Sequence, residues 1–387
     1  MFINIQDNRH FKKLLTKQKY SSIVTIILNK ETEEIIIKKK YLFILIFWLI
    51  NSLGCYYDND YNISLNNPNN SVTDEDHTNY PYDKIIRLNQ IQCRGTHNSY
   101  HKKNYLFRLP VFNYSHEPLN VQLDMGIRQF ELDIHYNFGR PLKVYHMRFI
   151  DFMTTCKYFI DCLAIIKDWS DNNTGHHILF IFIEPKDEFS IHKLTGYDKE
   201  VEDEILSIWP IERILTPDDV RGDHDTLLEA ILTVGWPTLG EVRNKAMFIL
   251  FDSGPMRDKY VQGNPGLKGR IMFARGGLKD EFGGFIKIDD PEKNLHKIQE
   301  AVKLGYLVRT RSDANCIEAY KKDFTRQEKA LSSGAQMIST DFPAPKDGMD
   351  YWFDMPDGTP SQCNPIIAPD FCTPCDVENL PTAPFCL

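Results

Sequence analysis

The sequence has no excess of positive charge and no long hydrophobic run. Its 387 residues carry 45 Lys and Arg against 53 Asp and Glu, a formal net charge of -8 at pH 7. That balance disfavours a nucleic-acid partner, which would select a basic surface. A hydrophobic content of 42% and a charged content of 25% are normal for a globular protein and exclude general disorder. The length suits one large barrel-type domain or two ordinary domains.

The most apolar segment lies near the N-terminus and is too short to span a bilayer comfortably. Three lysines at 38–40 precede the apolar run 41–50, and small residues then precede Cys55. This order is typical of a secretory signal. We therefore predict a signal peptide over residues 1–54 and a secreted or extracellular protein. The alternative is an uncleaved signal that anchors the protein in a membrane. Residues 55–84, rich in Asn, Asp and Tyr, are predicted to form a polar linker.

Cysteine usage agrees with export. Beyond Cys55 the chain has eight cysteines, and this even number fits an oxidised protein without free thiols. They are Cys93, Cys156, Cys162, Cys316, Cys363, Cys372, Cys375 and Cys386. Cys372-Thr-Pro-Cys375 lacks the context of a redox or zinc motif, so we expect a disulfide-stapled tail, an irregular appendage over residues 346–387. Triplets that match the N-glycosylation acceptor pattern also favour export, and they begin at Asn62, Asn69, Asn113 and Asn172.

Short apolar runs recur along the middle of the chain, most of them followed by helix-like segments. Runs such as ILFIFI suit a sheet that is buried on both faces. Glycine at 126, 305 and 334 ends three of the expected helices. The pattern predicts a (β/α)8 TIM barrel over residues 85–345. The expected strands are Ile86–Cys93, Gln129–Ile134, Leu142–Tyr145, His177–Ile183, Ala246–Phe251, Arg270–Ala274, Tyr306–Thr310 and Gln336–Thr340.

Two gaps predict that this barrel is distorted. Residues 135–141 are too few for a helical crossover between the second and third expected strands. Residues 252–269 show no clear helix. The expected barrel is therefore of the α/β class but irregular.

Polar side chains occur at nearly every expected strand end. In a TIM barrel these ends converge on one mouth, where catalytic residues gather. We therefore predict one shared site, instead of a series of solvated loop charges. The residues are His97 and Asn98, Glu131 and Asp133, His146, Glu184 and Lys186, Asp252, Arg275, Arg309 and Arg311, and Asp341.

Four of these residues form an all-oxygen set. Glu131 and Asp133 are two apart on one strand, so both point into the barrel. Together with Glu184 and the amide oxygen of Asn98 they suit a hard cation such as Ca²⁺ or Mg²⁺. His97 and His146 then lie on either side, where imidazoles can transfer protons. Two imidazoles, an oxygen-ligated cation and nearby Arg and Lys describe a site for a phosphodiester.

Five motifs together resemble the calcium-dependent phosphoinositide-specific phospholipase C family, in its secreted branch. They are RGTHNSYH, FELDIHY with His146 thirteen residues after Asp133, FIEPKDE, GYLVRTRSDAN and SGAQMISTDFP. The resemblance covers about residues 88 to 345. It implies that His97 acts on the phosphoryl group and that His146 is the general acid. It also implies calcium ligands at Asn98, Glu131, Asp133 and Glu184.

The resemblance further implies a reaction and a substrate. The inositol 2-hydroxyl of a phosphoinositide lipid at a membrane surface attacks phosphorus. Diacylglycerol and an inositol phosphate, partly in the 1,2-cyclic form, are released. His97, Glu131 and Glu184 are all candidates to accept the proton of the hydroxyl. The expected substrate-binding cations are Lys186, Arg275, Arg309 and Arg311.

The resemblance does not extend to the signalling enzymes of the family. The sequence shows no EF-hands, no pleckstrin-homology or C2-like region, and no evident protein partner. A preference for polyphosphorylated head groups is therefore not implied. The main rivals on the same fold are a glycerophosphodiester phosphodiesterase and a sphingomyelinase D-like enzyme. The order Arg94-Gly95-Thr96-His97, instead of His-Arg-Gly, argues against the first. A catalytically inactive secreted binding protein is the rival from another class.

Overall fold

The computed structural model divides into two units, Met1–Thr73 and Asp74–Leu387. In the first unit it describes only two short antiparallel strands, β1 (Ile27–Leu28) and β2 (Ile35–Ile36). In the second it describes residues 80–105, 109–137, 141–186, 197–346, 348–356 and 358–378. The apolar run of the predicted signal and most of the predicted linker lie outside these residues. Within the described residues, no helix combines the length and the apolar character that a membrane crossing requires.

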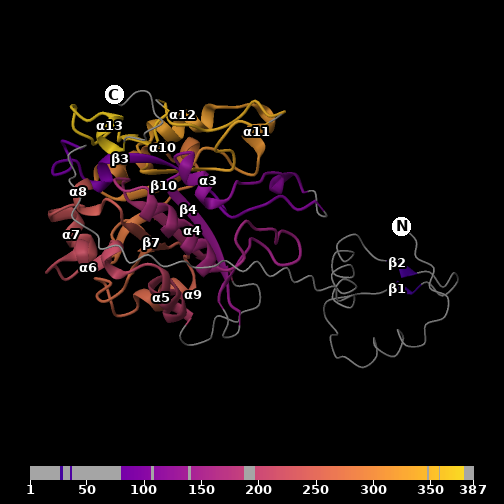
Figure 1. Cartoon of the computed structure of the whole chain (residues 1–387), viewed down its shortest axis with the longest axis horizontal. Helices are drawn as coiled ribbons and strands as arrows, with labels where there is room; N and C mark the ends of the chain where they lie inside the picture. The colour runs from indigo at the N-terminus through magenta and orange to yellow at the C-terminus, as the bar shows by residue number, and fades with distance from the viewer. Residues whose placement is uncertain are drawn as a thin grey trace. The chain divides into compact units, whose positions relative to one another are not determined.

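The second unit is built around a closed barrel of parallel strands (Figure 1). Around the barrel the strands follow the order β3-β11-β10-β9-β8-β7-β6-β4, and β4 pairs back to β3. This confirms the predicted TIM barrel. The eight strands are β3 (Ile91–Thr96), β4 (Gln129–His135), β6 (Leu179–Pro185), β7 (Ala246–Leu250), β8 (Met272–Arg275), β9 (Gly283–Lys287), β10 (Leu307–Arg311) and β11 (Met337–Thr340).

Helices cover the outside of this barrel, which explains the continuously apolar strands. Every residue of β7 is buried, because its two faces contact the barrel interior and the helical layer. The α-helices are α3 (Leu119–Asp124), α4 (Phe159–Asn172), α5 (Tyr197–Ile208), α6 (Pro217–Arg221), α7 (Leu227–Thr233), α8 (Leu239–Val242), α9 (Pro255–Val261), α10 (Pro291–Lys303), α11 (Ile317–Lys321), α12 (Thr325–Ser332) and α13 (Pro374–Val377). Short 3-10 helices are η1 (Leu88–Gln90), η2 (Pro110–Phe112) and η4 (Ile211–Arg213).

Several details of the sequence prediction were wrong. The first strand begins only at Ile91, because Leu88–Gln90 forms η1, and the segment 252–269, which shows no helical pattern, contains α9. The run Leu142–Tyr145 is not a barrel strand: it shortens to β5 (Lys143–Val144), which pairs antiparallel with β4 as the return arm of a hairpin. A hairpin needs no helical crossover, which explains the short gap before it. The barrel strand that the prediction missed is β9. Its two glycines are residues that strands disfavour, so the segment was not recognised. A Cβ at Gly284 would meet Ile231 Cδ1 at 2.5 Å, so the close packing of α7 requires glycine there.

The barrel wall has a narrow seam between β3 and β4. Only Gly95 and Gln129 pair across it, and a Cβ at Gly95 would collide with the Gln129 side chain. The rest of the same edge of β3 pairs with β12 (Ser361–Cys363), an antiparallel strand from the C-terminal segment. The expected appendage therefore contributes to the barrel wall, because β3 and β4 separate too far to pair with each other there.

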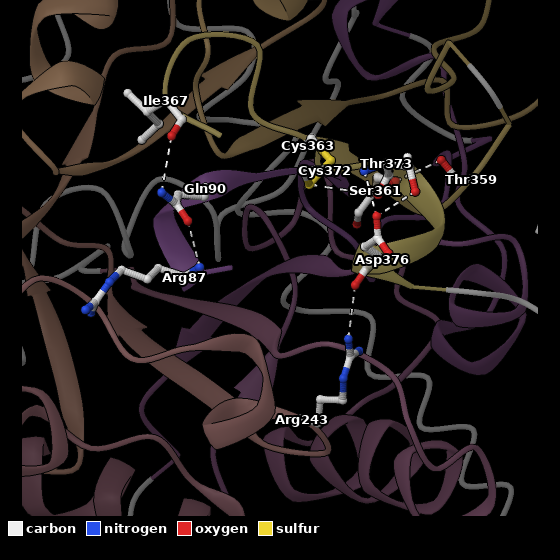
Figure 2. Close-up of a disulfide and its surroundings, with 10 residues drawn as sticks. All are labelled: Arg87, Gln90, Arg243, Thr359, Ser361, Cys363, Ile367, Cys372, Thr373 and Asp376. Carbon is white, nitrogen blue, oxygen red and sulfur yellow. Dashed lines mark hydrogen bonds between the residues drawn. A yellow bond between two sulfur atoms is a disulfide. The ribbon is translucent and has the colours of Figure 1, made fainter. Parts of the chain in front are cut away.

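A disulfide and several hydrogen bonds hold the C-terminal segment beside the first half of β3 (Figure 2). A disulfide joins Cys363 to Cys372, and Asp376 caps the start of α13 by accepting from the Thr373 amide at 2.8 Å. Arg243 donates to the Asp376 carbonyl at 3.3 Å. Two further contacts are buried: His177 Nε2 lies 2.5 Å from Ser361 Oγ, and the Arg128 guanidinium is paired with Glu378.

The prediction of disulfides was correct, but the prediction that all eight cysteines are oxidised was wrong. Cys156 pairs with Cys162, Cys363 with Cys372, and Cys375 is also disulfide-bonded. Cys93 and Cys316 are free thiols. Both are buried, Cys93 in β3 and Cys316 immediately before α11, and burial raises the pKa of each thiol. They therefore pack as small apolar side chains.

Substitution of Glu378 by alanine should destabilise the barrel strongly. The change leaves the Arg128 guanidinium buried without its carboxylate, a loss of about 3–5 kcal/mol for a broken buried pair. Chemical denaturation measures the free energy of unfolding. Asp370→Ala, at an exposed position of the same segment, is the control and should change it little. Replacing Arg128 and Glu378 together by methionine should recover part of the loss, and an unchanged stability of Glu378→Ala would contradict this account of the segment.

Candidate active site

The predicted site residues meet at the C-terminal mouth of the barrel. His97 and Asn98 follow β3, Glu131 and Asp133 lie on β4, and Glu184 lies on β6. Register pairs Asp133 with Glu184 across the two adjacent parallel strands. The parallel arrangement brings all five to one end of the molecule, as the sequence predicts.

Three carboxylates converge in this mouth. Oxygens of Glu131, Asp133 and Glu184 all lie within 4.8 Å of one another. Burial raises the pKa of Glu131 to about 7 despite Arg309, and it raises the pKa of Asp133 to about 6 despite Lys186. Neither oxygen of the fully buried Asp133 receives a hydrogen bond from the described residues. Three close carboxylates, of which Asp133 has no hydrogen-bond donor, fit a hard cation, which would also hold them ionised.

Lys186 and Asn98 complete the surroundings of the carboxylates. Lys186 Nζ lies 3.1 Å from Asp133 Oδ2 and 2.8 Å from Glu184 Oε1. Burial alone would raise the pKa of Glu184, but Lys186 and Lys287 lower it to about 2. Asn98 is buried in a left-handed conformation (φ 46°), which asparagine tolerates. Its amide nitrogen donates to the Tyr114 hydroxyl at 3.3 Å, so its amide oxygen is the atom it can offer to a cation.

His97 is held as a neutral base. Its Nδ1 lies 2.8 Å from Asp341 Oδ1, and its Nε2 lies 3.9 Å from Glu131 Oε1. Burial, followed by the nearby Arg311, lowers the pKa of His97 to about 3. Burial alone would raise the pKa of Asp341, but Arg311, at 2.8 Å, holds it well below its usual range. An ionised Asp341 accepts the Nδ1 proton of His97, so Nε2 carries a free lone pair.

His146 has a different partner. Its Nδ1 lies 2.8 Å from Asp151 Oδ2, and the ring of Phe112 packs edge-on against it at 5.1 Å. Asp151 is fully buried and also contacts His101 Nε2, at 2.9 Å. The side chain of His146 keeps 18% of its surface exposed. Its Nε2 is the ring nitrogen that this arrangement leaves for a substrate.

Two of the predicted substrate-binding arginines are paired inside the described part of the protein, and a third is not. Arg309 is fully buried, with contacts to Glu131, Ser339 and Asp289, and Arg311 pairs with Asp341. In contrast, the half-buried guanidinium of Arg275 has no hydrogen-bond or ion-pair partner among the described residues. Because of this pairing, Arg309 holds Glu131 in place and Arg311 holds Asp341 in place. The same pairing leaves Arg275 the better placed to meet a substrate anion.

Some residues in the mouth were missed by the sequence analysis. Lys287 lies at the end of β9, over the ring of Phe251 at 4.2 Å, and it went unnoticed because that strand was not predicted. Asp151 and His101 lie in loops without periodicity. A carboxylate five residues after His146 was the available signal, since a catalytic imidazole commonly needs an acidic partner. Asp252, which the sequence placed among the strand-end charges, accepts from the Gly254 amide at 2.8 Å beside α9.

A family model described as calcium-dependent phosphoinositide phospholipase C matches residues 86–139 and 138–365. Together these matches cover most of the chain and include every residue of the mouth described above. The chain belongs to this family. Membership confirms the predicted family, its enzyme class of phosphoric diester hydrolases, and calcium as its cofactor. It favours phospholipase C over the two rival phosphodiesterases. No curated protein matches the chain in sequence.

Solved structures agree with this phospholipase C fold. A calcium-dependent enzyme from a Gram-negative Pseudomonas species, crystallised with myo-inositol, shares 15% identity with a TM-score of 0.55 and covers 75% of this chain and 100% of its own. Another structure of the Pseudomonas enzyme shares 15% identity with a TM-score of 0.55, and covers 76% of this chain and 100% of its own. A Ca²⁺-dependent enzyme from Streptomyces antibioticus shares 18% identity, with a TM-score of 0.49, over 66% of this chain and 95% of its own. The Pseudomonas structures support the barrel fold.

Proposed function

We propose that this protein cleaves phosphatidylinositol lipids to diacylglycerol and an inositol phosphate, with His97 as general base and His146 as general acid. The observation that carries the proposal is the unlike pair of imidazoles on two sides of the carboxylate cluster. Each ring is partly exposed and has its Nδ1 bonded to a carboxylate, which leaves its Nε2 for a substrate. The rings differ in their surroundings, because burial and the nearby Arg311 lower the pKa of His97 and keep that ring neutral. An acid and a base held in this way are what an internal displacement at phosphorus requires.

The proton transfers follow from these two rings. His97 Nε2 accepts the proton of the inositol 2-hydroxyl as its oxygen forms a bond to phosphorus. The bond from phosphorus to the glycerol oxygen breaks, and His146 Nε2 delivers a proton to that oxygen. The product is a 1,2-cyclic phosphate, which reversal of the same roles opens with water. Arg275 and Lys287 are placed to orient the head group.

Glu131, Asp133, Glu184 and Asn98 are the residues that would hold calcium. Bound there, the ion would supply positive charge that stabilises the phosphoryl oxygens and acidifies the attacking hydroxyl. Arg309, 2.8 Å from Glu131 Oε2, fixes the orientation of that carboxylate. Arg311 does the same for Asp341, so the rigid β10 orients both the cation site and the base.

Exposed apolar side chains around the mouth support a lipid surface as the place of action. They come from the loops after β3, β5 and β10, where a monomeric soluble protein gains nothing from exposing them. A hydrogen bond of 2.7 Å from Asn113 to the Tyr320 hydroxyl joins two of these loops. The exposed Lys102 and Arg148 lie among them. The apolar rim consists of Tyr105, Leu109, Val111, Met147, Phe152, Met153, Ile317 and Tyr320.

A variant with Val111→Ser and Phe152→Ser should bind phosphatidylinositol vesicles at least tenfold more weakly. Burying each of these side chains in lipid contributes up to about 1.5–3 kcal/mol, and about 1.4 kcal/mol is tenfold in affinity. Vesicle sedimentation measures the binding. Leu232→Ser, at a 53% exposed position of α7, is the matched control. Hydrolysis of a monomeric short-chain substrate should be unchanged. Equal vesicle binding by the rim variant and the control would remove the membrane from the proposal.

Secretion is part of the same proposal. The disulfides Cys156–Cys162 and Cys363–Cys372 are typical of an oxidising compartment, and they support the predicted signal over residues 1–54. If the signal is cleaved, the mature protein should begin near Cys55 and carry N-glycans. Intact-mass analysis of secreted material tests both points.

Product analysis tests the proposed reaction. Phosphatidylinositol should yield diacylglycerol with 1,2-cyclic and open inositol phosphate, while glycerophosphocholine and sphingomyelin should not react. A methyl ether at the inositol 2-position should bind but not react, because the nucleophile is then missing. Turnover of the methylated lipid would show that water attacks phosphorus directly. A calcium-binding protein that turns over none of these lipids would be the inactive binding protein considered above.

A further inference from the structure

Asp151 occupies an unusual position behind the general acid. It is fully buried, and its carboxylate lies between two imidazoles. His146 Nδ1 is 2.8 Å from Oδ2, and His101 Nε2 is 2.9 Å from Oδ1 and 3.0 Å from Oδ2. Within the described residues it has no lysine or arginine partner. Among the described residues, its side chain therefore accepts hydrogen bonds from histidines alone.

The two imidazoles determine the charge of this carboxylate. Burial alone would raise the pKa of Asp151, but hydrogen bonds from His101 and His146 lower it. An ionised carboxylate only accepts, so both histidines must present a proton to it. His101 is fully buried, stacks on Tyr114 at 4.3 Å, and its Nδ1 has no partner among the described residues. The His101 ring is thus held between Asp151 and Tyr114.

Backbone contacts fix the geometry of this cluster. Met147 and Asp151 exchange two backbone hydrogen bonds, of 2.8 and 3.0 Å, which turn the chain so that the carboxylate returns beneath His146. The Lys102 amide donates to the Met153 carbonyl at 3.1 Å and joins this turn to the loop that carries His101. Phe112 packs against the His146 ring. The ring has little freedom to rotate or shift.

We propose that Asp151 is the positioning residue of the general acid and that His101 holds it ionised and in place. The inference rests on the proposed role of His146. By accepting from Nδ1, Asp151 orients the ring, and its charge stabilises the imidazolium, in which Nε2 carries the transferable proton. When Nε2 gives its proton to the departing glycerol oxygen, the neutral ring keeps its Nδ1 hydrogen bond. Asp151 itself stays unprotonated throughout.

The first test is Asp151→Asn, because an amide can accept from one imidazole only and must donate to the other. Turnover of phosphatidylinositol should fall by roughly 10²-fold or more, within the range for a general acid, while an aryl phosphodiester, whose leaving group needs no proton, should be nearly unaffected. Asp168→Asn, an exposed carboxylate of α4, is the matched control. The double variant with His146→Ala should be little slower than His146→Ala alone.

The outcomes separate this inference from the proposed function. If His146→Ala shows no dependence on the leaving group, the proposed acid is wrong. If His146→Ala shows it and a folded Asp151→Asn loses equally on both substrates, Asp151 is only structural and the inference is overturned. Should Asp151→Asn not fold, nitrogen-15 NMR of histidine-labelled wild-type protein decides. His146 protonated at Nδ1 and His101 at Nε2 would support the inference, and the opposite tautomer at His146 would overturn it.

Discussion

Replacing His146 by alanine is expected to slow cleavage of phosphatidylinositol by roughly 10²–10⁴-fold, the usual range for a positioned general acid. The glycerol oxygen is a poor leaving group, and it needs a proton as its bond to phosphorus breaks. An aryl or thio-phosphodiester departs without one, so the same variant should lose far less on such a substrate. Steady-state rates on the two substrates measure the difference.

His97→Ala is the companion variant, and it should be impaired on both substrates. Its proposed contact is with the nucleophile and the phosphoryl group, which are the same whichever group leaves. The neutral ring, whose pKa is lowered to about 3, should not serve as an acid near neutral pH. If His97→Ala instead showed the leaving-group dependence and His146→Ala did not, the two roles would have to be exchanged.

Removal of calcium is the second change with a large expected effect. Chelation should abolish turnover, and added calcium should restore it. Calcium at a hundredfold excess over its Kd should also stabilise the protein by about 2.7 kcal/mol, measured as a shift in thermal unfolding. Asp133→Asn should lose both effects, because the site then has one carboxylate and one ligand oxygen fewer.

The controls distinguish a calcium site from a general effect of charge. Asp168→Asn makes the same chemical change on the exposed face of α4 and should retain both the thermal shift and the turnover. Full activity in excess chelator would count against the ion. Attention would then turn to Lys186, which already lies 2.8 Å from Glu184 and 3.1 Å from Asp133, and to Arg275.

The fold was largely predictable because a parallel barrel imposes a strong pattern on the sequence. Strands β6 and β7 are buried on both faces, and their continuous apolar runs could be recognised directly. β9 could not, because close packing against α7 requires glycine at Gly284, where a β-branched residue would have signalled a strand. β12 was missed for a related reason. Its three residues pair with an edge of β3 that no sequence pattern marks as open.

The candidate site divides in the same way. His97, Glu131, Asp133 and Glu184 lie at the ends of recognisable strands, so the topology alone predicts that they meet. His146 follows β5, which was wrongly predicted as a barrel strand. Because β5 pairs with β4 in a hairpin, His146 still lies at the mouth. Asp151 and His101 depend on how two loops fold over each other, and no periodicity records that. The internal pairing of Arg309 was also hidden, because charge alone does not say which partner a cation has.

The position of β12 has a consequence for how the polypeptide is made. All eight barrel strands are synthesised before residues 361–363, yet the seam beside β3 is completed by β12. Until that segment leaves the ribosome, β3 presents an unpaired backbone edge that other chains could join. A contact that spans about 270 residues of sequence is also slow to form, since it closes a very long loop. The nascent protein therefore depends on being shielded, or kept unfolded, until its last strand arrives.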